Sequence, residues 1–140
     1  MPAQCDVDLL AGVPLFADLS AADLKRIASV AKRMRYREGA VVVEEGSTGG
    51  RFFVIQSGSA RVVVRGRTRA TLGPGAYFGE LSVLDGEPRT ASVVAAEPLE
   101  VWSIADFNFR PLLKDRPALA LKLLTALTAR LRKAEKSLVS

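Results

Sequence analysis

Between Met34 and Ala105 the sequence consists of short β-rich segments separated by residues that favour turns. The candidate strands are Met34–Arg37, Val41–Glu44, Phe52–Gln56, Ala60–Arg65, Arg69–Leu72, Ala91–Val94 and Leu99–Ser103. Turn-forming residues separate them at Glu38–Gly39, Gly46–Ser47, Gly49–Gly50, Ser57–Gly58 and Gly66. Parallel strands would need long crossover helices, for which these intervals leave no room. We therefore expect antiparallel strands arranged as a β-roll or jelly roll.

The residues before this β-rich region have helical spacing. A short apolar cluster around Leu10 is interrupted by Pro14. Ser20 is a favourable N-cap, and Asp23 three residues later forms a near capping box with it. We expect a helix from about Ala21 to Lys32, whose apolar face consists of Leu24, Ile27, Ala28 and Ala31.

The residues after the β-rich region return to helical spacing. Asp106 is expected to cap a short helix that runs through Leu113, and Pro117 is expected to begin a long helix. Steps of four and three residues in the long helix predict a short heptad seam, made of Ala120, Leu124, Leu127, Leu131, Ala134 and Leu138. This seam either packs on the β-roll of its own chain or pairs with a second copy to form a homodimer.

These segments predict one domain over residues 1–140, with N-terminal helices at about 6–33, a β-roll at about 34–105 and C-terminal helices at about 106–138. The expected fold class is mainly β with flanking α-helices, an antiparallel β-roll of the double-stranded jelly-roll type. The longest apolar runs are too short to span a membrane, and no secretory signal is visible. Cys5, the single cysteine, cannot form an intrachain disulfide, so we expect a cytoplasmic protein.

The chain contains no histidine, and this excludes several kinds of site. A Ser-His-Asp triad, an imidazole base and a His-ligated metal centre all require that residue. The single cysteine excludes a thiolate zinc site as well. Metal-dependent jelly-roll enzymes rely on histidine ligands, so that enzymatic alternative fails. We expect neither an enzyme nor a bound cofactor.

The stretch from Gly73 to Ala95 combines turn-forming glycines with three polar side chains. Gly79 and Glu80 begin a predicted helix of about one and a half turns, and a helix N-terminus attracts phosphate. Arg89 adds a charged fork suited to a phosphodiester, and Thr90 adds a hydroxyl. An ionised Glu80 would repel phosphate, so it should face a hydroxyl such as that of a ribose. The pattern describes a nucleotide site, although Glu80 and Arg89 could instead form a simple ion pair within a turn.

This stretch resembles the phosphate-binding cassette of the cyclic nucleotide-binding domains, in which Phe-Gly-Glu is followed, eight residues later, by Arg-Ser/Thr/Ala-Ala. The chain matches that pattern with Phe78-Gly79-Glu80 and Arg89-Thr90-Ala91. The resemblance implies that Arg89 and the N–H groups near Thr90 and Ala91 hold the cyclic phosphate, and that Glu80 binds the ribose 2′-hydroxyl. It also implies backbone contacts from Gly79 and Leu81, an apolar floor of Val63, Leu72 and Phe78, and a contact between Arg130 and the base.

The resemblance implies a regulatory sensor whose C-terminal helix responds to the ligand, most simply cAMP. Thr90 also leaves cGMP open, because in eukaryotic kinases of the family a threonine at this position accompanies cGMP. The alternatives are a dimerisation or structural module with a degenerate site, and the sensor segment of a larger channel, kinase or transcription regulator. No recognition helix follows the long helix and no membrane segment is visible, so we expect neither nucleic acid nor membrane as a partner of this chain alone.

Overall fold

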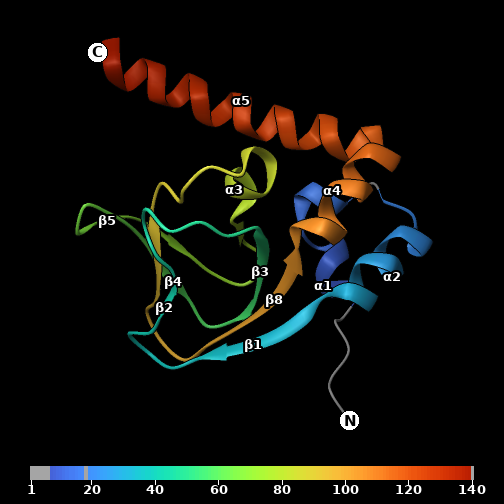
Figure 1. The fold of residues 1–140 in the computed structure, drawn as a ribbon, viewed down its shortest axis with the longest axis horizontal. Coiled ribbons are helices and arrows are strands. Elements are labelled where there is room, and N and C mark those ends of the chain that lie inside the picture. The colour runs from blue at the N-terminus through green and yellow to red at the C-terminus, as the bar shows by residue number, and fades with distance from the viewer. Residues whose placement is uncertain (1–6, 18, 140) are drawn as a thin grey trace.

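Two antiparallel sheets form a roll at the centre of the molecule, with helices packed at one end and α5 lying along one side (Figure 1). The computed structural model describes residues 7–17 and 19–139, so Cys5 and Asp6 lie outside the described residues. The elements are α1 (Val7–Ala11), η1 (Pro14–Phe16), α2 (Ala21–Val30), β1 (Lys32–Tyr36), β2 (Val41–Val43), β3 (Arg51–Ser57), β4 (Ala60–Val64), β5 (Arg67–Leu72), β6 (Tyr77–Phe78), α3 (Glu80–Asp85), β7 (Ser92–Ala95), β8 (Leu99–Ala105), α4 (Asp106–Asp115) and α5 (Pro117–Val139).

Each sheet has four strands, and all the strand pairs are antiparallel. One sheet has the order β1-β8-β3-β6, and the other has the order β2-β7-β4-β5. Strands that are distant in sequence therefore lie side by side, as Phe53 of β3 and Ser103 of β8 do. The predicted jelly roll with flanking helices is confirmed.

The observed ends of the predicted strands lie within two residues of the prediction, and three differences are informative. The strand β6 was not predicted, because a two-residue strand has no periodicity; its Phe78 pairs with Phe53, and their rings stack with centroids 4.8 Å apart. Arg65 was assigned to a strand but lies in the tight β4–β5 turn, where its φ is 52° and that of Gly66 is 77°. Lys32 was assigned to a helix but begins β1, opposite Ser103 of β8.

The alternation of β3 divides the core into two parts. Phe52 and Val54 point toward the helices, where they join a cluster with Phe16, Trp102 and Phe109. Phe53 and Ile55 point into the roll, together with Ala60, Phe78, Val93 and Val101. The first cluster anchors the helices on the roll, and the second forms the floor beneath the stretch that the sequence singled out.

The helices begin close to the predicted residues. Ser20 caps α2, and its Oγ accepts a hydrogen bond from the backbone N–H of Asp23 at 3.1 Å. Asp106 was predicted as the cap of α4, but Ala105 takes that position, and Asp106 is the first helical residue. Pro117 begins α5 as predicted. Over residues 7–17 and 19–139, no helix has both the length and the apolar character that crossing a membrane requires.

Candidate functional site

The chain from β6 to β7 folds as a short helix between two left-handed glycines. Gly79 has a φ of +92° and precedes α3, which ends at Gly86 with a φ of +71°. The backbone N–H of Gly86 donates to the carbonyl of Ser82 at 3.0 Å. The predicted helix of about one and a half turns is confirmed, including its end at Asp85.

Gly79 allows three parts of the chain to meet. A Cβ at this residue would collide with the carbonyl oxygen of Arg51 and would lie 2.9 Å from Nη1 of Arg89. The positive φ also strains any residue with a side chain. Glycine at this position therefore lets the buried guanidinium of Arg89 lie directly against the backbone.

Arg89 is buried, with 8% of its surface exposed. Its backbone N–H donates to the carbonyl of Ser47 at 2.8 Å, and its carbonyl accepts from the N–H of Gly46 at 2.8 Å. Its Nη2 donates to the carbonyl of Arg51 at 3.3 Å. Burial lowers the pKa of Arg89, and the negative charge of Glu80 opposes that shift. Among the described residues, no carboxylate forms a salt bridge with Arg89, so the charge of Glu80 acts on this buried cation without a direct ion pair.

Glu80 is also buried, with 3% of its surface exposed. Its Oε1 accepts a hydrogen bond from Nη1 of Arg130, which α5 brings over the site. The alternative interpretation, an ion pair between Glu80 and Arg89, is not what the described structure shows. The first turn of α3 and the middle of α5 are thus joined at one carboxylate.

These side chains surround a pocket with a volume of about 110 Å³. Seven of the predicted site residues line it: Phe78, Gly79, Glu80, Arg89, Thr90, Ala91 and Arg130. Val62 lines it in place of Val63, because alternate residues of β4 face the roll and Val62 shares the inner face with the buried Ala60. Leu72 packs against the core of the roll instead. Leu81 lies in α3, and its side chain is outside the described part of the structure.

Besides Val62, sequence analysis missed three residues that line the pocket, namely Val43, Ser82 and Val93. Val93 could have been found, since alternation along β7 directs Val93 and Ala95 inward. Val43 and Ser82 had no such signal, because their position depends on how β2 and α3 pack. In the described residues, no group of three carboxylate or thiol ligands could hold a metal ion.

The wall of the pocket can bind a ligand with two kinds of polar group. The guanidinium of Arg89, which has no carboxylate partner among the described residues, attracts an anion, and Thr90 lines the same pocket with a hydroxyl to offer. The carboxylate of Glu80 accepts from a hydroxyl, and Val62 and Phe78 offer apolar surface.

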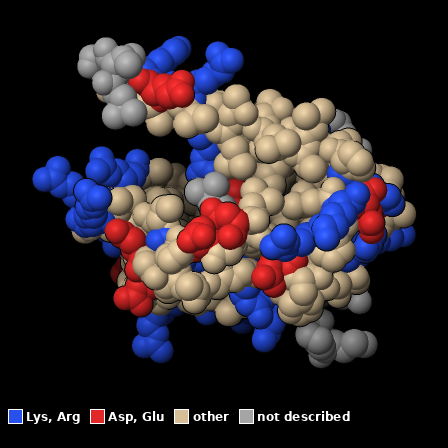
Figure 2. All heavy atoms as spheres, turned by 45° about the horizontal axis from the view of Figure 1, so that its top comes forward, with Lys and Arg blue, Asp and Glu red and all other residues tan. Residues whose placement is uncertain are grey.

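Outside the pocket, four exposed arginines lie on β4, β5 and their connecting turn. Figure 2 shows Lys and Arg side chains gathered at one edge of the molecule. The four arginines are Arg61, Arg65, Arg67 and Arg69.

Comparison with known proteins gives consistent matches. The family described as the cyclic nucleotide-binding domain matches residues 33–116. A cyclic nucleotide-gated potassium channel of Mesorhizobium japonicum is 37% identical over 112 residues, which are 80% of this chain and 31% of the channel. The cyclic AMP receptor protein of Thermus thermophilus is 33% identical over 129 residues, which are 89% of this chain and 60% of that protein.

The solved structures include PfPKA-R with cAMP bound, which superimposes with a TM-score of 0.83 at 26% identity, over 94% of this chain and 45% of that one. The chain therefore spans less than two thirds of each of these relatives.

Proposed function

Because the chain belongs to the cyclic nucleotide-binding domain family, we propose that it is a cytoplasmic regulatory sensor that binds cAMP in the pocket between α3, β7 and α5. The observation that carries this proposal is the buried Arg89, which lacks a carboxylate partner in the described structure and lies in the same pocket as Glu80. A buried cation is costly unless a counter-charge reaches it. A ligand phosphate supplies that charge.

In the proposed complex each polar group of the nucleotide has a matching partner. Arg89 and the N–H groups near Thr90 and Ala91 bind the cyclic phosphate. Glu80 accepts from the ribose 2′-hydroxyl, with backbone contacts from Gly79 and Leu81. Phe78 and Val62 contact the apolar face of the ligand, and Arg130 stacks on the base. The matched proteins include a cyclic AMP receptor protein and a cAMP-bound PfPKA-R as well as cGMP-dependent protein kinases, so the preference for cAMP is decided by direct comparison of the two ligands.

The helix α5 is the part of the molecule that responds in this proposal. The pocket volume of about 110 Å³ is below the 300–1,000 Å³ that is usual for small-molecule sites. Arg130 of α5 narrows it by reaching Glu80, the group that the ribose needs. Nucleotide binding therefore requires Arg130 to leave or share that carboxylate, which favours a different position of α5.

Calorimetry of the purified chain with cAMP, cGMP and linear 5′-AMP tests the proposed ligand. We expect the tightest binding with cAMP and the weakest with 5′-AMP, whose doubly ionised phosphate does not match a site for a diester. Tighter binding of cGMP would overturn the preference. If none of the three nucleotides gives a heat of binding, the site is degenerate.

Amide hydrogen exchange tests the response of α5 separately. Saturating cAMP should change exchange rates in residues 117–137, with β3 and β8 as internal references that stay protected. Unchanged exchange along α5, in a sample that calorimetry shows to be saturated, would contradict the role of the helix while leaving binding intact.

The same helix also offers a surface for a second copy of the chain. Leu121, Leu124 and Leu131 of α5 are 65%, 59% and 60% exposed. They follow one another at helical spacing on one face. We propose that this stripe pairs with its equivalent in a homodimer, and that the whole protein uses the sensor for regulation rather than catalysis.

A further inference from the structure

A second, larger hollow lies on the other side of Arg89. It has a volume of about 460 Å³, within the usual range of small-molecule sites. Residues of β1, β2, β3 and the loop between β2 and β3 line it, and they include Met34, Tyr36, Val43, Arg51 and Phe53. Arg89 and Val43 line both this hollow and the pocket described above. The function proposed above makes no use of the hollow.

The guanidinium of Arg89 presents a different nitrogen to each cavity. Nη1 lies against Gly79, on the side of α3. Nη2 lies against Gly49, which lines the second hollow, at 3.6 Å from the place that a Cβ of Gly49 would occupy. Nη2 uses one hydrogen for the carbonyl of Arg51, at 3.3 Å, and has a second hydrogen to donate.

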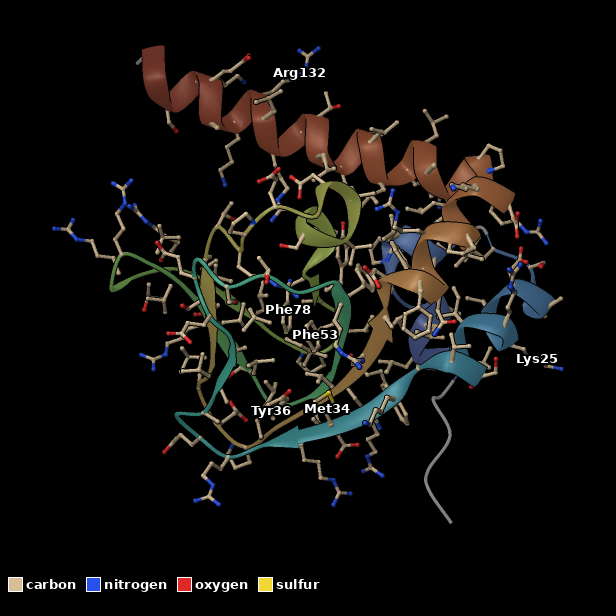
Figure 3. All side chains as sticks on the ribbon, viewed as in Figure 1. Lys25, Met34, Tyr36, Phe53, Phe78 and Arg132 are labelled. Atoms are coloured by element: carbon tan, nitrogen blue, oxygen red, sulfur yellow. The ribbon has the colours of Figure 1, made fainter. Side chains whose placement is uncertain are left out.

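Aromatic and apolar side chains form the floor and one wall of the hollow. Phe53 is buried, and Met34 and Tyr36 are half-buried. Figure 3 shows Met34 and Tyr36 on β1 directed toward Phe53, which lies next to Phe78 inside the roll. The Tyr36 hydroxyl donates to the sulfur of Met34 at 3.7 Å, which leaves the lone pairs of its oxygen to accept from a ligand. A flat ring fits between such walls.

The charge around the hollow favours an anion. Arg51 lies two residues from Phe53 on β3, so both side chains are on the same face of the sheet. Its Nη1 donates to Ser103 at 2.9 Å, which holds the guanidinium at this face. Two guanidinium groups, of Arg51 and Arg89, line the hollow together with one carboxylate, that of Glu44, so the lining carries a net positive charge. Two further carboxylates lie close by, because Glu80 acts on Arg89 from the side of α3 and Oδ2 of Asp106 lies against Gly50. A carboxylate is a small planar anion that such forks bind through two parallel hydrogen bonds.

From this combination we infer that the second hollow is a binding site for a small aromatic carboxylate. The ring lies against Met34, Tyr36 and Phe53, and the carboxylate is bound by Arg51 and by Nη2 of Arg89. Because a cyclic phosphate would use the same guanidinium from the other side, the two ligands weaken each other. Thermodynamic linkage requires that each ligand lowers the affinity of the other by the same factor.

The test uses 2-naphthoate as the probe and 2-naphthylmethanol as its uncharged control. Binding of each compound is measured from the amide chemical shifts of the labelled chain. We expect 2-naphthoate, without nucleotide, to shift resonances of residues 34–36, 41–43 and 47–53 in a saturable way. The alcohol should bind at least about tenfold more weakly, the factor for losing about 1.4 kcal/mol of charge-assisted bonding. Arg51→Gln should weaken naphthoate binding to the level of the alcohol. The matched control Arg61→Gln removes an exposed arginine that lines neither cavity and should leave naphthoate binding unchanged.

The coupling is measured by titrating cAMP with and without saturating 2-naphthoate. We expect at least about a fivefold loss of cAMP affinity, the lower end of typical couplings between two sites. Only this coupling measurement rests on the proposed function, because the chemical-shift titration with 2-naphthoate contains no nucleotide. Shifts confined to the α3 pocket, equal affinity for naphthoate and the alcohol, or undiminished naphthoate binding to Arg51→Gln would overturn the inference.

Discussion

At the scale of single residues, Arg89 carries the largest expected effect on binding. It is buried, and within the described residues it has no carboxylate partner, so its charge is available to a ligand. Arg89→Ala should weaken cAMP binding by about 2–4 kcal/mol, the range for removing a charge-assisted contact to a desolvated anion. Calorimetry measures this loss. Arg61→Ala, which removes an exposed arginine outside the pocket, is the control and should bind normally. Near-normal affinity of Arg89→Ala would exclude the phosphate role.

Gly79 makes the site possible by the absence of a side chain. Gly75 has a similar φ of +86°, but a Cβ there would meet nothing within 4 Å. Gly75→Ala should therefore lower the free energy of unfolding only by the left-handed strain, about 1–2 kcal/mol. Gly79→Ala should cost about 1–3 kcal/mol more, because its Cβ collides with the Arg51 carbonyl. Urea unfolding of the two variants measures the difference, and equal losses would mean that the backbone contact is unimportant.

The sequence allowed prediction of the residues that belong to one continuous motif. Gly79, Glu80, Arg89 and Thr90 could be found because the cassette is local in sequence, and they do line one pocket. The contact between Arg89 and the Arg51 carbonyl could not be found, because it joins residues 38 positions apart. The choice of Val62 over Val63 depends on which face of β4 is inward, and the apolar run Val62–Val64 does not show this by itself; the buried Ala60 does, since it shares a face with Val62.

At the scale of elements, the ion pair of Asp23 and Arg116 joins α2 to the residue before α5. Nε of Arg116 donates to Oδ2 of Asp23 at 2.7 Å. That hydrogen bond lowers the pKa of Asp23, against the effect of burial. Since the folded pKa lies below the unfolded one, the stabilisation is complete well above the ordinary carboxyl pKa of about 4 and is lost as pH falls through the folded value.

Asp23→Asn should therefore lower the thermal midpoint at pH 7 and have a smaller effect as the solution becomes strongly acidic. Thermal unfolding of both proteins between pH 7 and pH 2 measures the difference. Arg116→Gln removes the same interaction and should give the same pH profile, with little further loss in the double variant. A difference in midpoint that persists undiminished in acid would show that Asp23 acts through packing or capping.

The elements that sequence analysis predicted best are those with a strong local pattern. The β3 strand contains four consecutive apolar residues between turn signals, and α5 shows helical spacing over six turns, so both were found at nearly the observed bounds. The two-residue β6 has no period, and the two-residue turn at Arg65 needs a positive φ that arginine does not signal.

At the scale of the whole molecule, α5 has two apolar faces rather than one seam. Leu119 and Leu123 are buried against the helical core, and Leu127 packs on the same cluster. Leu124 and Leu131, which were assigned to the same seam as Leu127, are instead exposed. The two alternatives left open by the sequence thus apply to different residues: the first face packs on its own chain, and the second is available to another copy.

The exposed face predicts self-association that can be separated from nucleotide binding. The double variant Leu124→Glu/Leu131→Glu should convert a dimer to a monomer, because two charges in each helix would be buried against two in its partner. Sedimentation across a concentration series measures the oligomeric state. Calorimetry should show that the double variant binds cAMP with an affinity within about twofold of that of the parent chain, a change of less than about 0.5 kcal/mol in binding free energy. Ala129→Glu places one charge on an exposed position on the opposite side of α5 from this stripe and should leave the dimer intact. A monomeric parent chain at all concentrations would contradict the prediction, and loss of cAMP binding in the double variant would mean that dimer formation completes the site.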